Sequence, residues 1–283
     1  MPGTLYVVAT PIGNLEDVTL RALRVLREVA LIAAEDTRRT ARLLQQYSIS
    51  TPTTSLHEHN EHARTPGLVE RLRGGESIAL VSDAGTPGIS DPGSRLVAAA
   101  HAAGVRVEPV PGASAAAAAV SASGISADEG FVFMGFPPSK RSRRQEWLRN
   151  LADERRPIVL YEAPHRIHAT IKDIHTELGN RLLFVGRELT KAHETLAVRP
   201  TSDWLESLPP ERGEFVLVVS GVPEEVSTKR VVPTDDEMAD TFGRLTNNGT
   251  LDRRAALKET ARMHAVKAKQ VFAALERVKK LVK

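Results

Sequence analysis

Short apolar runs alternate with longer segments of helical apolar spacing along residues 1–222. Runs such as Leu5–Ala9 and Ser77–Val81 are typical of buried strands, whereas Leu20, Leu23 and Leu26 mark one face of an amphipathic helix. This alternation predicts an α/β fold with a largely parallel sheet, because crossover helices join parallel strands. In residues 1–112 we expect further strands at Leu31–Ala34 and Val105–Val110, and helices capped by Asp17 and over Arg39–Tyr47 and Ser94–Ala103.

Residues 113–222 repeat this alternation and predict a second α/β domain. Pro111-Gly112 marks the expected hinge between the two domains. Two expected strands, Thr195–Arg199 and Glu214–Val219, have no helix between them, so the second sheet is expected to be mixed. The other expected elements are strands at Phe131–Phe136, Pro157–Tyr161 and Leu182–Gly186, and helices over Ala113–Ser123, Arg143–Leu151 and Ile167–Leu178.

The C-terminal part of the chain has a wholly helical pattern. A linker is expected over residues 222–233, and a basic three-helix module over residues 234–283. The last two helices of this module have the spacing of a helix-turn-helix. Residues 241–283 hold 11 lysines and arginines against three acidic residues, although the net charge of the whole chain is only +3. Positive charge is therefore concentrated in this module.

Composition excludes several classes of protein. The 283 residues suffice for two or three domains with buried cores. The chain has no cysteine, which excludes disulfides, thiolate metal sites and thiol nucleophiles. No apolar run reaches the roughly 18 residues of a membrane-spanning helix, and the N-terminal residues do not read as a signal peptide. We therefore expect a cytoplasmic enzyme without membrane association.

Three turns rich in small residues follow expected strands, at residues 9–14, 82–93 and 109–114. The second is the most informative, because its 12 residues include three glycines and two prolines that expose the main chain. Since ligands bind at the carboxyl ends of strands in open α/β sheets, the three turns predict one edge of a cleft. The histidines in residues 56–62 match no zinc-binding spacing, so we expect a polar loop there and no metal site.

Five segments together carry a family resemblance: Leu5–Asp17, Ala34–Arg38, Asp83–Gly93, Pro111–Ser114 and Tyr161–Arg166. They resemble the tetrapyrrole methylase superfamily and, within it, the bacterial branch that methylates a cytidine ribose of 16S ribosomal RNA. The resemblance implies two α/β domains with S-adenosylmethionine in the cleft between them, and commonly a homodimer. The residues that it assigns to the cofactor are Pro11, Ile12, Asp83, Ala84, Gly85, Thr86, Ile89, Ala113, Ser114, Phe136, Tyr161 and Phe215.

The implied reaction transfers a methyl group to the ribose 2′-hydroxyl of a decoding-centre cytidine. Such a displacement needs no metal and depends on holding oxygen, methyl group and sulfur in line. A positioned carboxylate could accept the hydroxyl proton, and Glu35, Asp36 and Glu162 are the candidates. For Glu35 and Asp36 the alternative is a structural role, as an ion pair with Arg38 or as negative charge at a helix N-terminus.

The basic residues at the cleft edge and in the C-terminal module favour contact with the phosphates of a nucleic acid. The resemblance implies that this partner is 16S ribosomal RNA or the small ribosomal subunit. Basic residues are more often solvated surface, and the tail could instead serve dimerisation. Two other functions stay open: a methylase of a tetrapyrrole-like small molecule, and a non-catalytic RNA-binding factor for ribosome assembly. The expected RNA contacts are Lys140, Arg141, Arg143, Arg144, Arg253, Arg254, Lys267 and Lys269.

Overall fold

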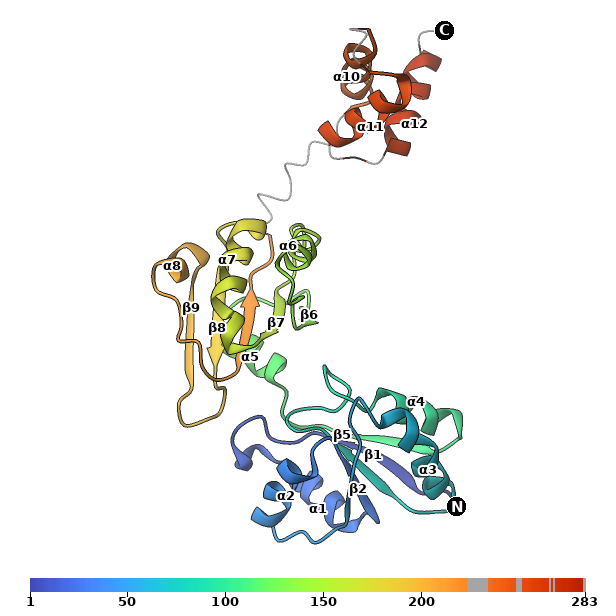
Figure 1. Ribbon diagram of the computed structural model, residues 1–283, viewed down its shortest axis with the longest axis vertical. Coiled ribbons are helices and arrows are strands. Elements are labelled where there is room, and N and C mark those ends of the chain that lie inside the picture. Colours follow the sequence, from blue (N-terminus) through green and yellow to red (C-terminus); the bar gives the residue numbers. More distant parts are fainter. Residues whose placement is uncertain (223–233, 248–250, 265, 267, 282–283) are drawn as a thin grey trace. The chain divides into compact units, whose positions relative to one another are not determined.

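The computed structural model describes residues 1–222, 234–247, 251–264, 266 and 268–281. The chain forms two compact units, Met1–Pro223 and Glu224–Lys283 (Figure 1). The boundary expected at residues 112/113 lies inside the first unit and stays a prediction. Among the described residues, no helix is both long and apolar enough to span a membrane.

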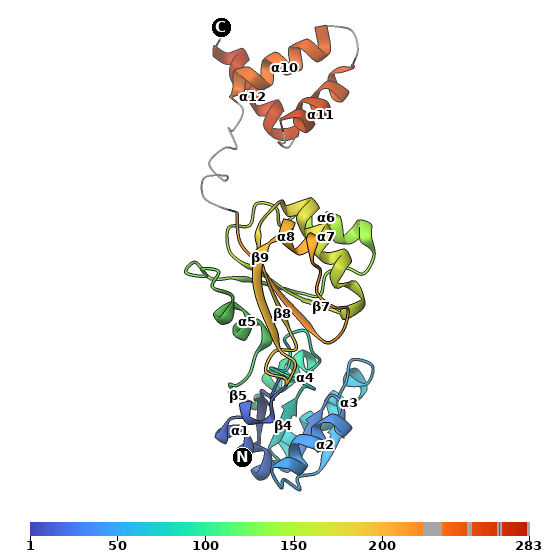
Figure 2. The same ribbon diagram turned by 90° about the vertical axis from the view of Figure 1, so that its left-hand side faces the viewer.

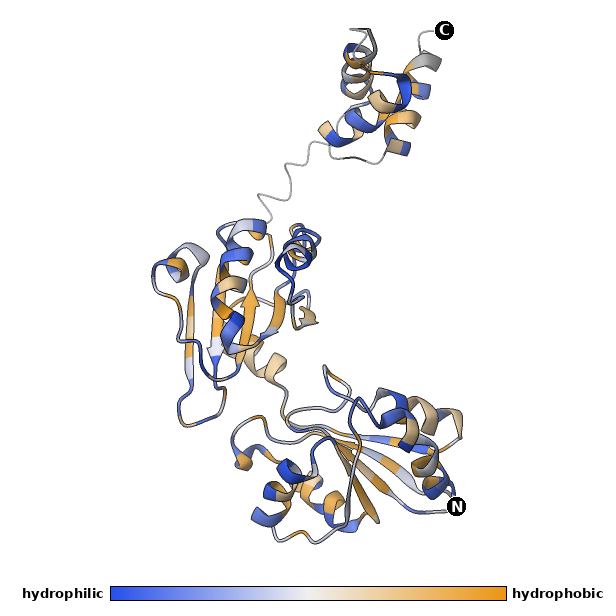
Figure 3. Ribbon diagram, in the orientation of Figure 1, coloured by the Kyte–Doolittle hydropathy of each residue, from blue (hydrophilic) through white to orange (hydrophobic). Residues whose placement is uncertain are grey.

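The first sheet is parallel, with strand order β3-β2-β4-β1-β5. Apolar side chains pack on both of its faces, with α1 and α2 against one and α3 and α4 against the other. Figure 3 shows hydrophobic residues along its strands. Because the strands are parallel, their carboxyl ends share one edge of the sheet. The elements are β1 (Thr4–Val8), β2 (Leu31–Ala34), β3 (Thr53–Ser55), β4 (Ile78–Val81), β5 (Arg106–Val110), the short 3-10 helix η1 (Leu15–Asp17), α1 (Leu20–Glu28), α2 (Thr37–Gln46), α3 (Glu61–Arg73) and α4 (Ser94–Ala102).

The second sheet is mixed, as the sequence predicts, with strand order β6-β7-β10-β8-β9. Its strand β10 runs antiparallel to both neighbours, whereas β6 and β7 are parallel. Helix α5 covers one face, and α6, α7 and α8 cover the other (Figure 2). The elements are α5 (Ala115–Ser123), β6 (Val132–Gly135), α6 (Arg141–Arg149), β7 (Ile158–Glu162), η2 (Pro164–Arg166), α7 (Ile167–Leu178), β8 (Leu182–Arg187), β9 (Thr195–Pro200), α8 (Thr201–Glu206) and β10 (Phe215–Val219).

Within its described residues, the second unit contains three helices, α10 (Asp235–Asn247), α11 (Arg253–Met263) and α12 (Ala268–Leu281), which confirms the expected helical module. A small apolar cluster that includes Met238, Val271 and Leu275 holds them together. Arg277 adds an ion pair with Asp235 at 2.6 Å, between α12 and α10. Apart from Val222, the expected linker lies outside the described residues.

Local expectations fail at three places. Thr19, not Asp17, caps α1, because its Oγ1 accepts the N–H of Ala22 at 3.0 Å and Asp17 belongs to the preceding 3-10 helix. Strand β3 and helix α3 were not expected: β3 has only three residues, and α3 contains Pro66. They flank a turn at residues 56–60, so the polar loop expected over residues 56–62 is present but ends where α3 begins, at Glu61. Helix α8 has only six residues and was also not expected from the sequence.

Candidate functional site

A cavity of about 430 Å³ opens at the carboxyl edge of the first sheet, within the first unit. This volume suits a ligand of nucleoside size. One wall comes from the loop after β4 and the ends of β1 and β2, and another from β6, β7 and β10 of the second sheet. The residues expected from the sequence that line it are Ile12, Glu35, Asp83, Ala84, Gly85, Thr86, Ile89, Ser114, Phe136, Tyr161, Glu162 and Phe215.

Main-chain hydrogen bonds hold the loop of residues 82–93 against the end of β1. Thr10 and Gly85 exchange two of them, at 2.8 and 3.0 Å. Gly85 has a φ of +82°, where a side chain would be strained. The Thr86 hydroxyl donates to the carbonyl of Ala113 at 3.3 Å. The loop therefore presents its main chain to the cavity in a fixed conformation.

Glu61, at the start of α3, holds the far end of the same loop. Its carboxylate accepts the N–H groups of Gly93 and Arg95, each at 3.1 Å, where α4 begins. Glu61 is only 9% exposed, so this contact is shielded from water. This role of Glu61 could not be predicted from the sequence pattern, because the helix that carries Glu61 was not expected.

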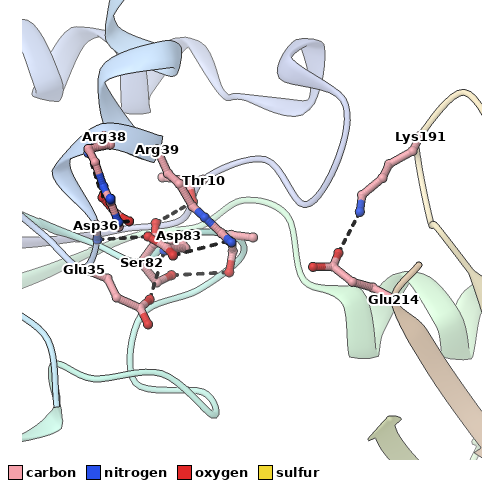
Figure 4. A network of polar contacts seen from close by, with 10 residues as sticks. Thr10, Glu35, Asp36, Arg38, Arg39, Ser82, Asp83, Lys191 and Glu214 are labelled. Carbon is pink, nitrogen blue, oxygen red and sulfur yellow. Dashed lines mark hydrogen bonds and ion pairs between the residues drawn. The ribbon is translucent and has the colours of Figure 1, made fainter. Parts of the chain in front are cut away.

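Asp83 and Glu35 form a polar network with the start of α2 (Figure 4). Oδ1 of Asp83 accepts the N–H of Asp36 at 2.9 Å, and the N–H of Asp83 donates to Glu35 at 3.1 Å. Arg39 lies 3.4 Å from the other oxygen of Asp83. Burial raises the pKa of Glu35 above its usual value, and the negative charge of Asp83 adds to this rise.

Asp36 has the structural role that the sequence left open. Its side chain caps α2 by accepting the N–H of Arg38 at 2.8 Å and forms an ion pair with the Arg38 guanidinium at 2.6 Å. These hydrogen bonds hold the pKa of Asp36 well below its usual range. Asp36 does not line the cavity. The geometry thus favours helix capping over proton transfer at this residue.

The Glu162 carboxylate is also occupied by contacts with other residues of this chain. It is 2% exposed and accepts hydrogen bonds from the Thr170 hydroxyl at 2.5 Å and from the N–H of Ala163 at 2.8 Å. The guanidinium of Arg166 lies 3.2 Å away. These contacts indicate that the Glu162 carboxylate organises the wall of the cavity rather than exchanging protons with a substrate.

Aromatic rings form the apolar part of the cavity. Phe136 is 55% exposed, and its ring packs edge-on against Tyr161 with centroids 5.7 Å apart. The ring centroid of Phe133 lies 4.9 Å from that of the same Tyr161 ring. Phe215 is buried. An exposed ring beside small residues is suited to contact a flat heteroaromatic group.

Two residues expected at the cofactor do not line the cavity, and several residues that line it were not expected. Pro11 and Ala113, both expected to touch the cofactor, flank the cavity without lining it. Leu189 follows β8 and Glu214 precedes β10, and they reach the cavity only because the second sheet brings these strand ends to it. Asp91 lies in the loop of residues 82–93, which was expected to bind a ligand, but Asp91 itself was not named. The lining residues that were not expected are Arg39, Ser90, Asp91, Ala115, Ala163, Pro164, Leu189, Glu214 and Val216.

The expected RNA contacts divide into exposed and buried residues. Arg144 was wrongly assigned to RNA: its side chain is 4% exposed and forms an ion pair with Asp173 at 2.6 Å, which makes it part of the packing between α6 and α7. Lys267 lies outside the described residues. The expected contacts that are exposed are Lys140, Arg141, Arg143, Arg253, Arg254 and Lys269.

The histidines near β3 lie in a turn and at the start of α3. His57 Nε2 lies 3.0 Å from Nδ2 of the Asn60 side chain, and the His57 and His59 rings meet edge to face. Within the described part of the chain, no three His, Asp or Glu side chains are grouped so that they could hold a metal ion.

The sequence matches the family model of Tetrapyrrole (Corrin/Porphyrin) Methylases over residues 4–204. This chain belongs to the tetrapyrrole methylase family. Its relatives include the Ribosomal RNA small subunit methyltransferase I of Synechocystis sp., which is 53% identical over 229 residues, 79% of this chain and 81% of the relative. The protein of the same name from Vibrio cholerae is 44% identical over 273 residues, 95% of this chain and 92% of the relative.

Solved structures of tetrapyrrole methylases share the fold. A uroporphyrin-III C-methyl transferase from Thermus thermophilus, complexed with S-adenyl homocysteine, superposes with a TM-score of 0.56 at 19% identity. The match covers 80% of this chain and all of that protein. The likeness confirms the tetrapyrrole methylase fold for the two sheets. The Vibrio relative matches over nearly the whole chain, so the sequence likeness within the family extends beyond these sheets.

Proposed function

We propose that this tetrapyrrole methylase transfers a methyl group from S-adenosylmethionine to the ribose 2′-hydroxyl of a cytidine in 16S ribosomal RNA. The observation that carries the proposal is the sequence likeness to proteins named Ribosomal RNA small subunit methyltransferase I, at 53% and 44% identity. The cavity supplies the second support, because its size and lining suit a nucleoside that bears a positive charge.

The residues of the cavity fit the methyl donor. Phe136 and Tyr161 offer ring surfaces for an adenine, and the loop of residues 82–93 offers main-chain groups for the ribose and the amino-acid part. Gly85 lacks a side chain where the main chain faces the cavity, and an added Cβ would lie 3.5 Å from Ile12. Pro11 and Ala113 would support this binding from behind the lining residues.

The chain's own contribution to the reaction is mainly positioning. The bound donor supplies an electrophilic methyl group. Holding the ribose hydroxyl in line with that group and excluding water removes most of the entropic cost of the transfer. As the new O–CH3 bond forms, the electrons of the broken C–S bond stay on sulfur and the hydroxyl proton passes to a base or to water. Of the three carboxylates expected from the sequence, only Glu35 is both near the cavity and free of an ion pair among the described residues.

Ribosomal RNA would meet exposed cations on both units. Arg143 is exposed on α6, and Arg253, Arg254 and Lys269 are exposed in the helical module. Each cation that neutralises a phosphate releases a condensed counterion, so binding is expected to weaken steeply with salt. By analogy with the family resemblance, we further propose that the protein acts as a homodimer, which light scattering coupled to gel filtration tests.

The proposed function is tested with small ribosomal subunits that lack the modification. Incubation with methyl-labelled S-adenosylmethionine should place one label per particle, on the ribose of a cytidine, as nucleoside mass spectrometry can show. Label on a base, or turnover of a porphyrinoid instead of RNA, would overturn the proposal. Replacing Arg253 and Arg254 by glutamine should reduce methylation of ribosomal particles while leaving donor binding unchanged.

A further inference from the structure

Asp91 is a half-buried carboxylate that lines the cavity and has no cationic partner among the residues that the structure describes. The hydroxyl of Ser82 favours the ionised form of Asp91, although its own hydrogen bonds go to the carbonyls of Ala84 and Gly85, at 3.4 and 3.5 Å. Two other carboxylates differ from Asp91 in having cations: Asp83 has Arg39 at 3.4 Å, and the buried Asp173 has Arg144 at 2.6 Å. An ionised carboxylate in a partly desolvated site costs free energy unless a positive charge approaches it.

The surroundings of Asp91 add to this cost. Glu35 and Asp83 line the same cavity, and their negative charges act on Asp91. Burial, together with these two carboxylates, raises the pKa of Asp91 to about 6. Above that pH the Asp91 carboxylate is ionised. The described lining residues include five acidic side chains, Glu35, Asp83, Asp91, Glu162 and Glu214, and a single arginine, Arg39. Glu162 and Glu214 form ion pairs with Arg166 and Lys191, which do not line the cavity, so Glu35, Asp83 and Asp91 share Arg39 as the lining cation. Such a cavity repels phosphate and attracts a cation.

We infer that Asp91 is the residue by which this cavity distinguishes a positively charged methyl donor from its neutral product. The inference rests on the proposed function, because it takes the ligand to be S-adenosylmethionine. This donor carries a sulfonium cation, whereas S-adenosylhomocysteine has a neutral thioether at the same position. A nearby carboxylate therefore stabilises the donor and contributes nothing comparable to the product.

This charge recognition would favour turnover. Attraction between Asp91 and the sulfonium raises donor affinity, and it disappears when the methyl group leaves, because sulfur keeps the bonding electrons and becomes neutral. The product then loses the contribution of Asp91 and dissociates more readily.

Calorimetric titration of the full-length protein at pH 7.5 tests the inference with three ligands. These are S-adenosylmethionine, S-adenosylhomocysteine and sinefungin, in which a protonated amine replaces the sulfonium. Asp91→Asn should weaken binding of the two cationic ligands by about ten-fold and change that of S-adenosylhomocysteine by less than about two-fold, since a partly screened charge pair contributes on this scale. Asp128→Asn removes one negative charge from an exposed position outside the cavity and serves as the matched control.

The outcomes separate this inference from the proposed function. If Asp91→Asn weakens the binding of all three ligands equally, or of none of them, Asp91 does not distinguish a charged ligand from a neutral one and the inference is wrong. Loss of methyl transfer with unchanged affinities would likewise overturn it and would point to proton acceptance. If the unaltered protein binds neither the donor nor sinefungin, the proposed function fails as well. Circular dichroism of Asp91→Asn confirms that the variant is folded.

Discussion

The main-chain N–H of Asn14 donates a hydrogen bond to Oγ1 of Thr190 over 3.0 Å, which joins the loop after β1 to the loop between β8 and β9. Thr190 has a φ of +65°, a conformation that β-branched residues rarely adopt, and its own N–H donates to Glu194 at 2.6 Å. Backbone strain of this kind persists where surrounding contacts enforce it. Leu189, next to Thr190, lines the cavity, so the contact positions part of its wall.

Gly13→Ala should disrupt this contact. A Cβ at Gly13 would lie 2.7 Å from the carbonyl oxygen of Leu189 and 2.6 Å from Cγ of Lys191, so the loop must move. We expect a loss of about 1–3 kcal/mol in the free energy of unfolding, as for other overpacked sites, and weaker donor binding. Hydrogen exchange should become faster over residues 188–194. Gly67→Ala, which adds a Cβ with nothing within 4 Å, is the control and should not alter this exchange.

Two replacements of Asp83 should show how much its contact with the Asp36 N–H contributes to stability. Asp83→Ala removes the acceptor of the Asp36 N–H and the partner of Arg39, so we expect a loss of about 1–3 kcal/mol in the free energy of unfolding. Asp83→Asn keeps an oxygen that can accept the Asp36 N–H and should recover most of this loss. Urea denaturation of both variants measures the difference, and equal stabilities would show that the Asp36 contact contributes little.

The sequence predicted the alternation of strands and helices well, because the apolar period of each long element is decided locally. The sequence pattern did not predict α3, because Pro66 and a polar first turn are unfavourable signals for a helix. In the fold, packing of Leu68 and Leu72 against the first sheet stabilises this helix. The sequence pattern indicated the loop of residues 82–93 from glycine and proline alone, but it could not tell which of the carboxylates near it would be paired. Pairing depends on contacts between distant segments, such as Asp36 with Asp83 or Glu162 with Thr170.

Neighbouring arginines on α6 should respond oppositely to substitution. Arg143→Ala should leave the free energy of unfolding within about 0.5 kcal/mol, because its side chain is exposed. The same change should weaken binding to small-subunit RNA and reduce the slope of log affinity against log salt by about 1. Arg144→Ala should instead cost about 3 kcal/mol of stability, because it leaves Asp173 buried with weaker partners. Filter binding at several salt concentrations and urea denaturation make the two measurements.

Asp91 should make the ligand-free protein less stable at neutral pH than in mild acid. Burial raises the pKa of Asp91 to about 6, above the value of about 4 in an unfolded chain. Between these two values the folded state binds more protons than the unfolded state, so stability falls as pH rises through this window and then levels off. Burial raises the pKa of Glu35 too, and Glu35 therefore contributes a slope of the same sign.

Asp91→Asn removes the contribution of Asp91 to this slope. At pH 7.5 the variant should be more stable than the unaltered protein by on the order of 1 kcal/mol, after allowance for the partial exposure of the carboxyl group. At pH 4 the two proteins should have nearly equal free energies of unfolding, because Asp91 is then protonated in the folded state. Urea denaturation at both pH values measures this, with Asp128→Asn as the control for removing a charge. Equal stabilities at pH 7.5 would mean that Asp91 is solvated well enough to ionise without cost, and the same result would weaken the case for its role in recognising a cationic donor.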